Sequence, residues 1–291
     1  MKVAVVGPGA MGILYASRLQ LSGVSTTLVD YRSDRVMRLA KSGLEIEVES
    51  ETLKAKPSFT TTTPTNQDLF IILTKAYSTG NLKLPNNVPV LTLQNGLGNV
   101  ETLCKSVGSS SVLAGTTTEA STLLEEGKIR HAASGTTVFG AWTSCAHELA
   151  EEVLTKAGFK VEITMSPGQM IWEKTVMSAG INPLTAILGV PNGKLVESKE
   201  ARQLMRDLVV EAAKIASTEG YRFEYSLVEK SEQICSDSAT NISSMLQDVR
   251  AGRRTEIDAI CGEILARGVS ASLPCPRTRV IYQIVKSMEQ A

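Results

Sequence analysis

The chain has 291 residues, of which 43% are hydrophobic and 21% are charged. This length and composition are typical of a soluble globular protein with a substantial core and two domains. Thirty basic residues balance thirty acidic ones, which argues against a nucleic-acid partner and against a polybasic membrane contact. No apolar run reaches the length of a membrane span and no targeting segment precedes the first strand, so we expect a cytoplasmic protein.

The cysteines and histidines narrow the chemistry further. The five cysteines are scattered without a Cys-x-x-Cys pair, as free thiols in a reducing cytoplasm would be. His131 and His147 are the only histidines, and no metal-ligand spacing surrounds them. We therefore expect neither a metal site nor a Ser-His-Asp hydrolase.

Up to about residue 165, short apolar runs alternate with helical patterns, which predicts a doubly wound α/β sheet. The expected strands are Lys2–Val6, Thr26–Val29, Asp68–Leu73, Pro89–Leu93 and Val112–Gly115, and the expected helices cover 10–21, 33–41 and 99–106. Residues 44–49 are expected to form a small strand outside the central sheet. Lys128–His131 and Thr136–Gly140 are expected to pair as a hairpin beyond that sheet.

Strand patterns vanish from about residue 167, and helical patterns replace them. The expected helices cover 169–187, 198–218, 226–235, 244–250, 256–268 and 276–289. A sheet-rich half followed by a helical half predicts a Rossmann-type α/β domain at 1–166 and an all-α C-terminal domain at 167–291.

The first predicted strand leads directly into a glycine-rich turn before a helical pattern. The six residues of this turn are Gly7, Pro8, Gly9, Ala10, Met11 and Gly12. The spacing Gly-x-Gly-x-x-Gly in this context is typical of a dinucleotide-binding loop, in which Gly7 permits the turn, Gly9 the approach of a pyrophosphate, and Gly12 close helix packing. The following helix would offer its N-terminal N–H groups to the phosphates. The alternative is a glycine-rich turn without a ligand.

The end of the second predicted strand bears on which dinucleotide binds. Asp30 follows the glycines by about 20 residues, where an acid can bind the ribose hydroxyls and favour NAD. Arg32 and Arg35 come next, and an arginine there can bind a 2′-phosphate and favour NADP. Arg35 can equally lie on a solvated helix face, so the sequence leaves both cofactors open.

Lys75 and Asn95 each follow a predicted strand of the sheet. Ligands bind at the carboxyl ends of such strands, so both residues are candidate contacts for a cofactor or substrate. The alternatives are that Lys75 is a surface lysine in a loop and that Asn95-Gly96 forms an ordinary turn.

Lys174, Ser178 and Asn182 are four residues apart and therefore share one stripe of a predicted helix. Such a stripe can face a cleft or merely solvent, and most lysines are exposed. Pro183 disfavours helical backbone at Asn182 and is expected to kink or end the helix there, which can aim Asn182 at a ligand.

Two capping patterns lie further along the helical half. Ser244-x-x-Gln247 and Thr255-x-x-Asp258 predict helices that begin near residues 244 and 255. Ser244 and Glu256 would then lie near helix N-termini, either as capping-region residues alone or also as ligand contacts.

These segments resemble the ketopantoate reductase family. The first reads Lys174-Thr-Val-Met-Ser-Ala-Gly-Ile-Asn182-Pro-Leu-Thr-Ala-Ile, then Pro191-Asn192-Gly193; the second reads Ser243-Ser-Met-Leu-Gln-Asp-Val-Arg250, then Thr255-Glu-Ile-Asp258. With the glycine turn, Lys75 and Gln94-Asn95-Gly96, the resemblance covers nearly the whole chain. It implies reduction of 2-dehydropantoate to pantoate by NADPH, in the route to pantothenate and coenzyme A.

The resemblance also implies a role for each site residue. Lys174 and Glu256 would be catalytic, with Lys174 stabilising and protonating the ketone oxygen and Glu256 anchoring a substrate hydroxyl. The implied substrate contacts are Asn95, Ser178, Asn182, Asn192 and Ser244. The implied cofactor contacts are the six residues of the glycine turn together with Arg32, Lys75, Asn95 and Glu256.

Ser178 stands where the family usually has Asn, and a serine side chain is shorter, so substrate identity stays open. The alternatives are a reductase of another branched 2-oxo acid, a relative in the wider 3-hydroxyacid dehydrogenase group, or a non-catalytic NADP-sensing protein. We expect a small-molecule 2-oxo acid as the partner, and a monomer or a homodimer.

Overall fold

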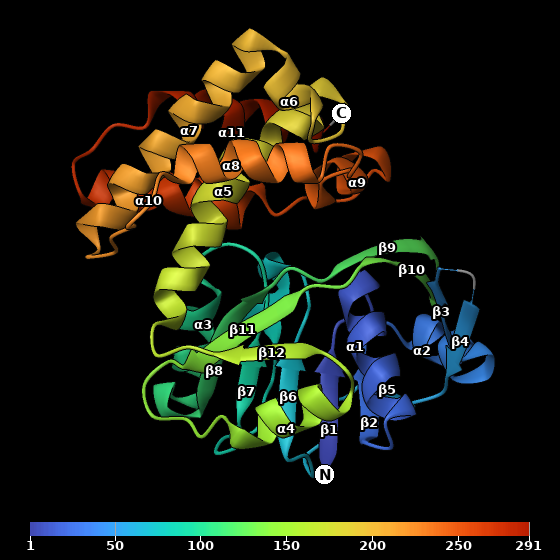
Figure 1. The fold of residues 1–291 in the computed structure, drawn as a ribbon. Coiled ribbons are helices and arrows are strands. Elements are labelled where there is room, and N and C mark those ends of the chain that lie inside the picture. Colours follow the sequence, from blue (N-terminus) through green and yellow to red (C-terminus); the bar gives the residue numbers. More distant parts are fainter. Residues whose placement is uncertain (50, 291) are drawn as a thin grey trace. The chain divides into compact units, whose positions relative to one another are not determined.

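The computed structural model describes residues 1–49 and 51–290, which form two compact units. The first unit comprises Met1–Gln94 and Asn99–Met170, and the second comprises Asn95–Gly98 and the chain from Ile171 onward. The first unit is α/β and the second is helical (Figure 1), which confirms the predicted fold class. Within the described residues, no helix combines the length and the apolar character needed to cross a membrane.

An eight-stranded sheet in the order β12-β11-β8-β7-β6-β1-β2-β5 forms the centre of the first unit. Its strands are β1 (Lys2–Val6), β2 (Ser25–Val29), β5 (Ser58–Thr60), β6 (Leu69–Ile72), β7 (Val90–Thr92), β8 (Val112–Thr117), β11 (Thr136–Ala141) and β12 (Lys160–Ile163). Six neighbouring strands are parallel, in the order β5, β2, β1, β6, β7 and β8, and β11 runs antiparallel to β8. The five strands expected from the sequence all lie in this sheet. The chain crosses over beside β1, which makes the carboxyl ends of β1 and β6 the switch point of a doubly wound fold.

Helix α1 (Ala10–Leu21) lies between the large sheet and a second, smaller one. It contacts β1 and β2 on one side and the strands of the small sheet on the other. The remaining helices of the unit are α2 (Ser33–Ser42), η1 (Ala76–Asn81), α3 (Asn99–Val107), η2 (Ser109–Ser111) and α4 (Glu148–Lys156). Val3–Val6 are buried because both faces of β1 are covered, which explains a run of apolar residues without alternation.

The small sheet has the order β4-β3-β10-β9. Its strands are β3 (Leu44–Val48), β4 (Glu51–Ala55), β9 (Ala120–Glu125) and β10 (Lys128–Ala133). The strand expected near 44–49 is therefore confirmed outside the central sheet. The hairpin expected between Lys128–His131 and Thr136–Gly140 is wrong, because β10 pairs with β9 and β3 whereas β11 pairs with β8 and β12. The hairpin turn lies instead at Gly127, whose φ of +82° suits glycine.

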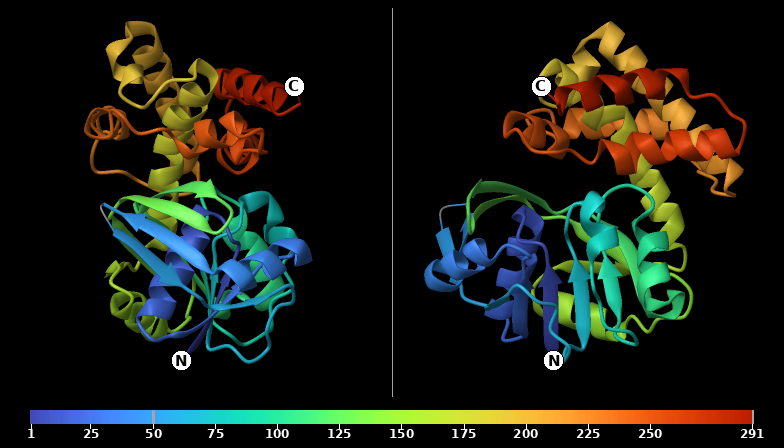
Figure 2. Two further views of the ribbon diagram at one scale, coloured as in Figure 1. Left: turned by 90° about the vertical axis from the view of Figure 1, so that its right-hand side faces the viewer. Right: turned by 180° about the vertical axis from the view of Figure 1, so that it is seen from behind.

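The second unit consists of helices that pack around one another in every view (Figures 1 and 2). They are α5 (Pro167–Leu188), which begins in the first unit, α6 (Lys194–Glu197), α7 (Lys199–Thr218), α8 (Leu227–Asp237), α9 (Ser244–Arg250), the π-helical turn η3 (Asp258–Gly262), α10 (Glu263–Ser270) and α11 (Pro276–Met288). Leu184 of α5, Met205 and Leu208 of α7 and Ile281 of α11 share one buried core. The six helices expected from the sequence are present, and the one expected at 256–268 opens with the π-helical turn.

Candidate functional site

The glycine turn joins β1 to α1, and two of its glycines are required by the protein itself. Gly7 has a φ of +109°, and a Cβ there would lie 2.8 Å from the backbone nitrogen of Thr74. A Cβ on Gly12 would lie only 1.7 Å from the carbonyl oxygen of Gly7. Gly9 differs, because a Cβ there would meet no atom within 4 Å. The exposed backbone of Gly9 is therefore where a ligand can approach this turn closely.

Neither a capping side chain nor an acidic residue of the first turn offsets the positive end of the α1 helix dipole. Gly9 is the N-cap residue and provides no side-chain cap, and the first turn contains no acidic residue. Ala10 and Met11 begin the helix and are half-buried, as is Pro8 before them. Such an N-terminus suits a bound phosphate group.

Asp30 lies at the end of β2, and its carboxylate is held by two arginines of the same unit. Its side chain is buried, and Arg35 binds both oxygens, with Nη2 donating to Oδ1 at 2.7 Å and Nε donating to Oδ2. The backbone N–H of Arg32 also donates to Oδ1 at 3.3 Å. The exposed guanidinium of Arg32 pairs with Asp34 at 2.6 Å. Hydrogen bonds within the unit thus occupy both oxygens of Asp30.

Lys75 is half-buried after β6, directly before η1. A buried amide fixes the backbone beside it, because Gln94 Nε2 donates to the carbonyl oxygen of Thr74 at 2.9 Å and to Thr79 Oγ1 at 2.8 Å. Thr74 also packs against Gly7. Lys75 therefore follows a residue that contacts the glycine turn.

Asn95 lies with the helical unit because its loop packs on the turn η3. The N–H of Leu97 donates to the carbonyl oxygen of Ala259 at 2.8 Å. Gly96 has a φ of +82°, and a Cβ there would lie 2.5 Å from that same oxygen, so only glycine fits. Asn95 Nδ2 then donates to Glu256 Oε2 at 3.2 Å, and Glu256 is only 6% exposed.

Lys174 is half-buried on α5. Burial lowers the pKa of its ammonium group to about 8, and the nearby charge of Glu256 opposes this fall. A lysine with this pKa can hold or release a proton near neutral pH, as a general acid must. The structure therefore brings Lys174 close enough to Glu256 for their charges to interact, and Glu256 in turn binds Asn95.

Ser178 and Asn182 follow Lys174 at four-residue spacing on α5, and both are half-buried. The sequence predicts that Pro183 kinks or ends the helix at Asn182. An end of the helix there is wrong, because α5 continues to Leu188 with Pro183 inside it. Proline removes one backbone N–H from a helix, and burial of Leu184 and its neighbours in the core stabilises the helix beyond it. The carbonyl oxygen of Asn182 accepts a hydrogen bond from Thr185 Oγ1 at 2.9 Å.

The N-terminus of α9 differs by one residue from the expectation. Ser243 is the N-cap residue, and its Oγ accepts from the N–H of Leu246 at 3.1 Å and lies 2.6 Å from Thr185 Oγ1. Ser243 is buried, whereas Ser244 begins the helix and is exposed. The cap expected at Ser244 is therefore Ser243, and the Ser244 hydroxyl plays no capping role.

Asn192 lies in the loop after α5 and is buried. Its Nδ2 donates to Ser238 Oγ at 2.9 Å, and its backbone N–H donates to the carbonyl oxygen of Asn241 at 3.0 Å. Among the described residues its amide oxygen has no hydrogen-bond partner. The structure therefore places Asn192 beside the end of α8.

Glu289 and Lys286 also belong to the surroundings of Glu256, although no motif in the sequence marks them. Glu289 Oε1 accepts from the backbone N–H of Thr255 at 2.7 Å, and Lys286 Nζ donates to Glu289 Oε2 at 2.8 Å. The only local signal is the spacing of Lys286 and Glu289, which allows an ion pair along one helix. The contact of Glu289 with Thr255 depends on how α11 packs.

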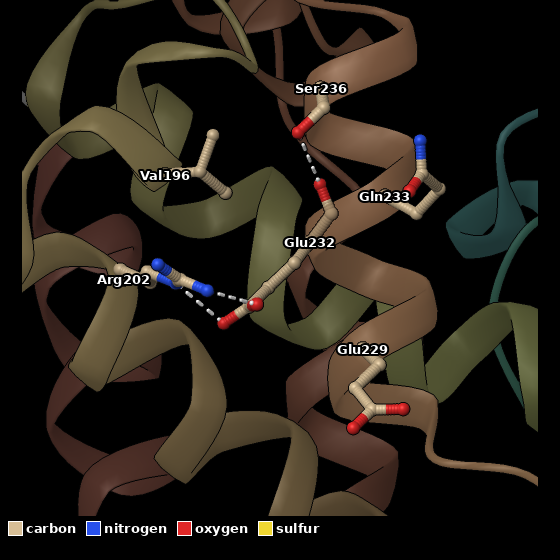
Figure 3. A pocket seen from close by; sticks show the side chains of 6 residues that line it. All are labelled: Val196, Arg202, Glu229, Glu232, Gln233 and Ser236. Carbon is tan, nitrogen blue, oxygen red and sulfur yellow. Dashed lines mark hydrogen bonds and ion pairs between the residues drawn. The ribbon is translucent and has the colours of Figure 1, made fainter.

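A polar pocket elsewhere in the helical unit contains none of the candidate residues. Its lining residues are Val196, Arg202, Glu229, Glu232, Gln233 and Ser236 (Figure 3). Arg202 donates to both carboxylate oxygens of Glu232 at 2.8 and 2.6 Å, so its charge is already matched. In the ranges 1–49 and 51–290, no three His, Cys, Asp or Glu side chains gather closely enough to hold a metal ion.

Comparison with known proteins gives the family. Residues 3–144 match the family model described as ketopantoate reductase PanE/ApbA, and residues 168–289 match the model of its C-terminal part. A 2-dehydropantoate 2-reductase of Halobacterium salinarum is 32% identical over 98% of both chains. The chain belongs to the ketopantoate reductase family. A second reductase of that name, from Pyrococcus horikoshii, is 33% identical over 99% of this chain and 98% of its own.

Solved structures share the fold over the full length. A PanE/ApbA family ketopantoate reductase from Ralstonia eutropha has a TM-score of 0.91 at 28% identity, covering 100% of this chain and 99% of its own. A D-mandelate dehydrogenase solved with NADH and anilino(oxo)acetate also has a TM-score of 0.91, at 24% identity and the same coverage. The ketopantoate reductase fold therefore includes both the glycine turn and the helical unit of this chain.

Proposed function

We propose that the protein is a 2-dehydropantoate 2-reductase, a cytoplasmic enzyme that reduces ketopantoate to pantoate with NADPH in the route to pantothenate and coenzyme A. The observation that carries this proposal is Lys174, a half-buried lysine whose pKa burial lowers to about 8, beside the buried carboxylate of Glu256. Reduction of a ketone needs a group that stabilises and then protonates the oxygen, and Lys174 has the charge and the pKa for both tasks.

The glycine turn fits the phosphates of a nicotinamide dinucleotide. Gly9 leaves space for close approach, and the first turn of α1 has no acidic residue to repel an anion. Gly7–Gly12, Arg32, Lys75, Asn95 and Glu256 are the residues proposed to contact the cofactor. When bound, the cofactor supplies the hydride, and the protein supplies orientation and electrostatics.

The surroundings of Asp30 support NADPH over NADH. An acid favours NAD when its oxygens accept from the ribose hydroxyls, but both oxygens of Asp30 already accept from Arg35 and Oδ1 also accepts from the Arg32 N–H, so fewer of their lone pairs are left for a ribose. The guanidinium of Arg35 also offsets the negative charge of Asp30, which would otherwise repel a 2′-phosphate. Arg32 and Arg35 are therefore proposed to favour the phosphorylated cofactor.

Lys174, Glu256 and Asn95 form the Lys174 cluster of the helical unit, in which Lys174 and Glu256 each have a defined task in the proposed reaction. Negative charge develops on the ketone oxygen as the hydride arrives, and the Lys174 ammonium stabilises that oxygen and then donates a proton to it. Neutral lysine is tolerated afterwards because burial disfavours its charged form. Glu256 raises the pKa of Lys174 and so keeps it protonated before the reaction. Glu256 also accepts a hydrogen bond from a substrate hydroxyl.

Four further residues are proposed substrate contacts because they stand at positions of the family motifs that the resemblance implies to contact substrate. They are Ser178, Asn182, Asn192 and Ser244. The orphaned amide oxygen of Asn192 and the exposed hydroxyl of Ser244 are groups that could hydrogen-bond a substrate. Ser178 is shorter than the asparagine usual in the family, which favours a second candidate function, reduction of another branched 2-oxo acid.

The deciding experiment follows oxidation of NADPH and of NADH with ketopantoate and with a panel of other 2-oxo acids. We expect ketopantoate with NADPH to give the highest kcat/KM. Faster turnover of another branched 2-oxo acid would support the second candidate. Cofactor binding without oxidation across the whole panel would contradict both and would instead support a sensing role. Sedimentation of the same sample would distinguish a monomer from a homodimer.

A further inference from the structure

We infer that Glu289, the residue directly after α11, is a positioning residue for Glu256, which it fixes through the neighbouring Thr255. This inference rests on the proposed role of Glu256 in binding substrate and in keeping Lys174 protonated. It concerns the residues that orient Glu256 and not those that touch the substrate.

The contact between Glu289 and Thr255 is double and buried. Oε1 of Glu289 accepts from both the backbone N–H and the Oγ1 of Thr255, each at 2.7 Å. Thr255 is 0% exposed, and its Oγ1 also accepts from the N–H of Ile257 at 3.2 Å. The hydroxyl of Thr255 therefore links Glu289 to the residues on both sides of Glu256, and this fixes the backbone from which the catalytic carboxylate projects.

A second contact from α11 fixes the other side of Glu256. Lys286 Nζ donates to Glu289 Oε2 at 2.8 Å and to Asp258 Oδ2 at 3.1 Å, and Tyr282 donates to Asp258 Oδ1 at 2.8 Å. Burial alone would raise the pKa of Glu289, but hydrogen bonds from Lys286 and Thr255 outweigh this effect and hold the pKa below its usual value. Glu289 is therefore an anion that Lys286 stabilises.

The backbone that follows Glu256 needs such anchors. Asp258 begins the π-helical turn η3, a rare geometry that occurs mostly as single turns and is frequent at functional sites. The same turn receives the Asn95 loop at Ala259, so its placement sets the distance between Asn95 and Glu256. Glu289 binds Thr255, and Tyr282 and Lys286 of α11 bind Asp258. These contacts hold the two ends of the segment that carries Glu256.

A double-mutant cycle tests the inference, with KM for ketopantoate as the readout. Glu289→Ala should raise KM by about tenfold in the otherwise native enzyme, but by less than about twofold in a Glu256→Ala background, because coupled residues are not additive. Glu289→Gln keeps an oxygen that accepts from Thr255 and should retain a KM close to that of the native enzyme. An equal rise of KM in both backgrounds, or none in either, would overturn the inference.

Glu197→Ala is the matched control. Glu197 pairs with Lys194 at the same three-residue spacing, at 2.6 Å, but both of these side chains are exposed. Its loss should leave KM unchanged. If Glu289→Ala does not fold, Thr255→Val removes the hydroxyl link alone and should raise KM only when Glu256 is present.

A readout without turnover separates this inference from the proposed function. The pKa of Lys174 is measured by NMR titration of lysine side chains, with its signal assigned by loss in Lys174→Arg. Glu256→Gln should lower this pKa because Glu256 raises it in the native protein. Glu289→Ala should also lower the pKa of Lys174, because Glu256 is then no longer held in place. A Lys174 pKa that falls in Glu256→Gln but stays native in Glu289→Ala would overturn the positioning role. Absence of ketopantoate reduction by the native enzyme would contradict only the proposed function.

Discussion

The glycine turn and the Lys174 cluster are built in opposite ways. The turn uses the backbone of six consecutive residues. The fold leaves no room for a Cβ at Gly7 or Gly12, whereas a Cβ on Gly9 would meet no protein atom and would only fill space left for a ligand. The cluster uses side chains from distant segments, and the hydrogen bond from Asn95 to Glu256 joins residues 161 positions apart. A backbone site therefore fails when atoms are added, whereas a side-chain site fails when atoms are removed. Each of the following substitutions tests one side of this contrast.

Removal of the Lys174 ammonium should have the largest effect. Lys174→Ala should lower kcat by about 10²–10⁴-fold, the usual contribution of a general acid, while the Kd for NADPH stays native because the glycine turn is intact. Steady-state kinetics and a fluorescence titration of NADPH measure the two quantities. Lys194→Ala, at an exposed lysine of the same unit, is the control. Near-normal turnover in Lys174→Ala would remove Lys174 from the mechanism.

Addition of one methyl group should have different effects at Gly12 and at Gly9. Gly12→Ala should lower the free energy of unfolding by about 1–3 kcal/mol, because the new Cβ would lie 1.7 Å from the Gly7 carbonyl oxygen. Gly9→Ala should keep native stability and weaken NADPH binding, because its Cβ points into the space left for the ligand. Urea unfolding and NADPH titration of both variants provide the data. Equal stability of the two variants would contradict the packing account.

Loss of the arginine that covers Asp30 should shift the cofactor preference. Arg35→Ala exposes the Asp30 carboxylate to the cofactor. The Kd for NADH divided by the Kd for NADPH should therefore fall by about tenfold, which corresponds to one hydrogen bond to a charged group. Arg38→Ala is the control, because Arg38 pairs with Asp34 and Glu126 at the surface. An unchanged ratio in Arg35→Ala would show that the Asp30–Arg35 pair does not select the cofactor.

The smallest effect concerns the two neighbouring serines at the start of α9. Ser243→Ala should lower the free energy of unfolding by about 1 kcal/mol, as loss of an N-cap does. Ser244→Ala should leave stability unchanged and raise KM for ketopantoate. Thermal unfolding and kinetics of the two variants test both statements. If Ser244→Ala lost stability and Ser243→Ala did not, Ser244 would be the N-cap residue.

The same contrast explains what the sequence predicts. The turn at Gly7–Gly12 and the parallel strands could be predicted because their signals are local: a glycine spacing and uninterrupted apolar runs. The sequence predicts the N-cap one position too late because Ser243 and Ser244 both suit an N-cap, and the hydrogen bond between Ser243 and Thr185 decides between them. The hairpin was wrong because two strand-like segments near each other in sequence belong to different sheets.

The Lys174 cluster could be predicted only through the family resemblance, since four-residue spacing alone does not distinguish a site from a solvated face. No local pattern connects Thr255 with Glu289, which lie 34 residues apart and meet only after α11 has packed. The burial that lowers the pKa of Lys174 is likewise a property of the folded unit. Such features follow from tertiary packing, which one sequence does not display.

The pH dependence of kcat/KM for ketopantoate tests the central claim most directly. Lys174 must be protonated to donate a proton, so activity should be constant at low pH and fall as the pH rises through the Lys174 pKa of about 8. In Glu256→Gln this fall should begin at lower pH, because the negative charge that raises the Lys174 pKa is gone. A rate that stays constant well above pH 8, or a fall that does not move in Glu256→Gln, would contradict the account.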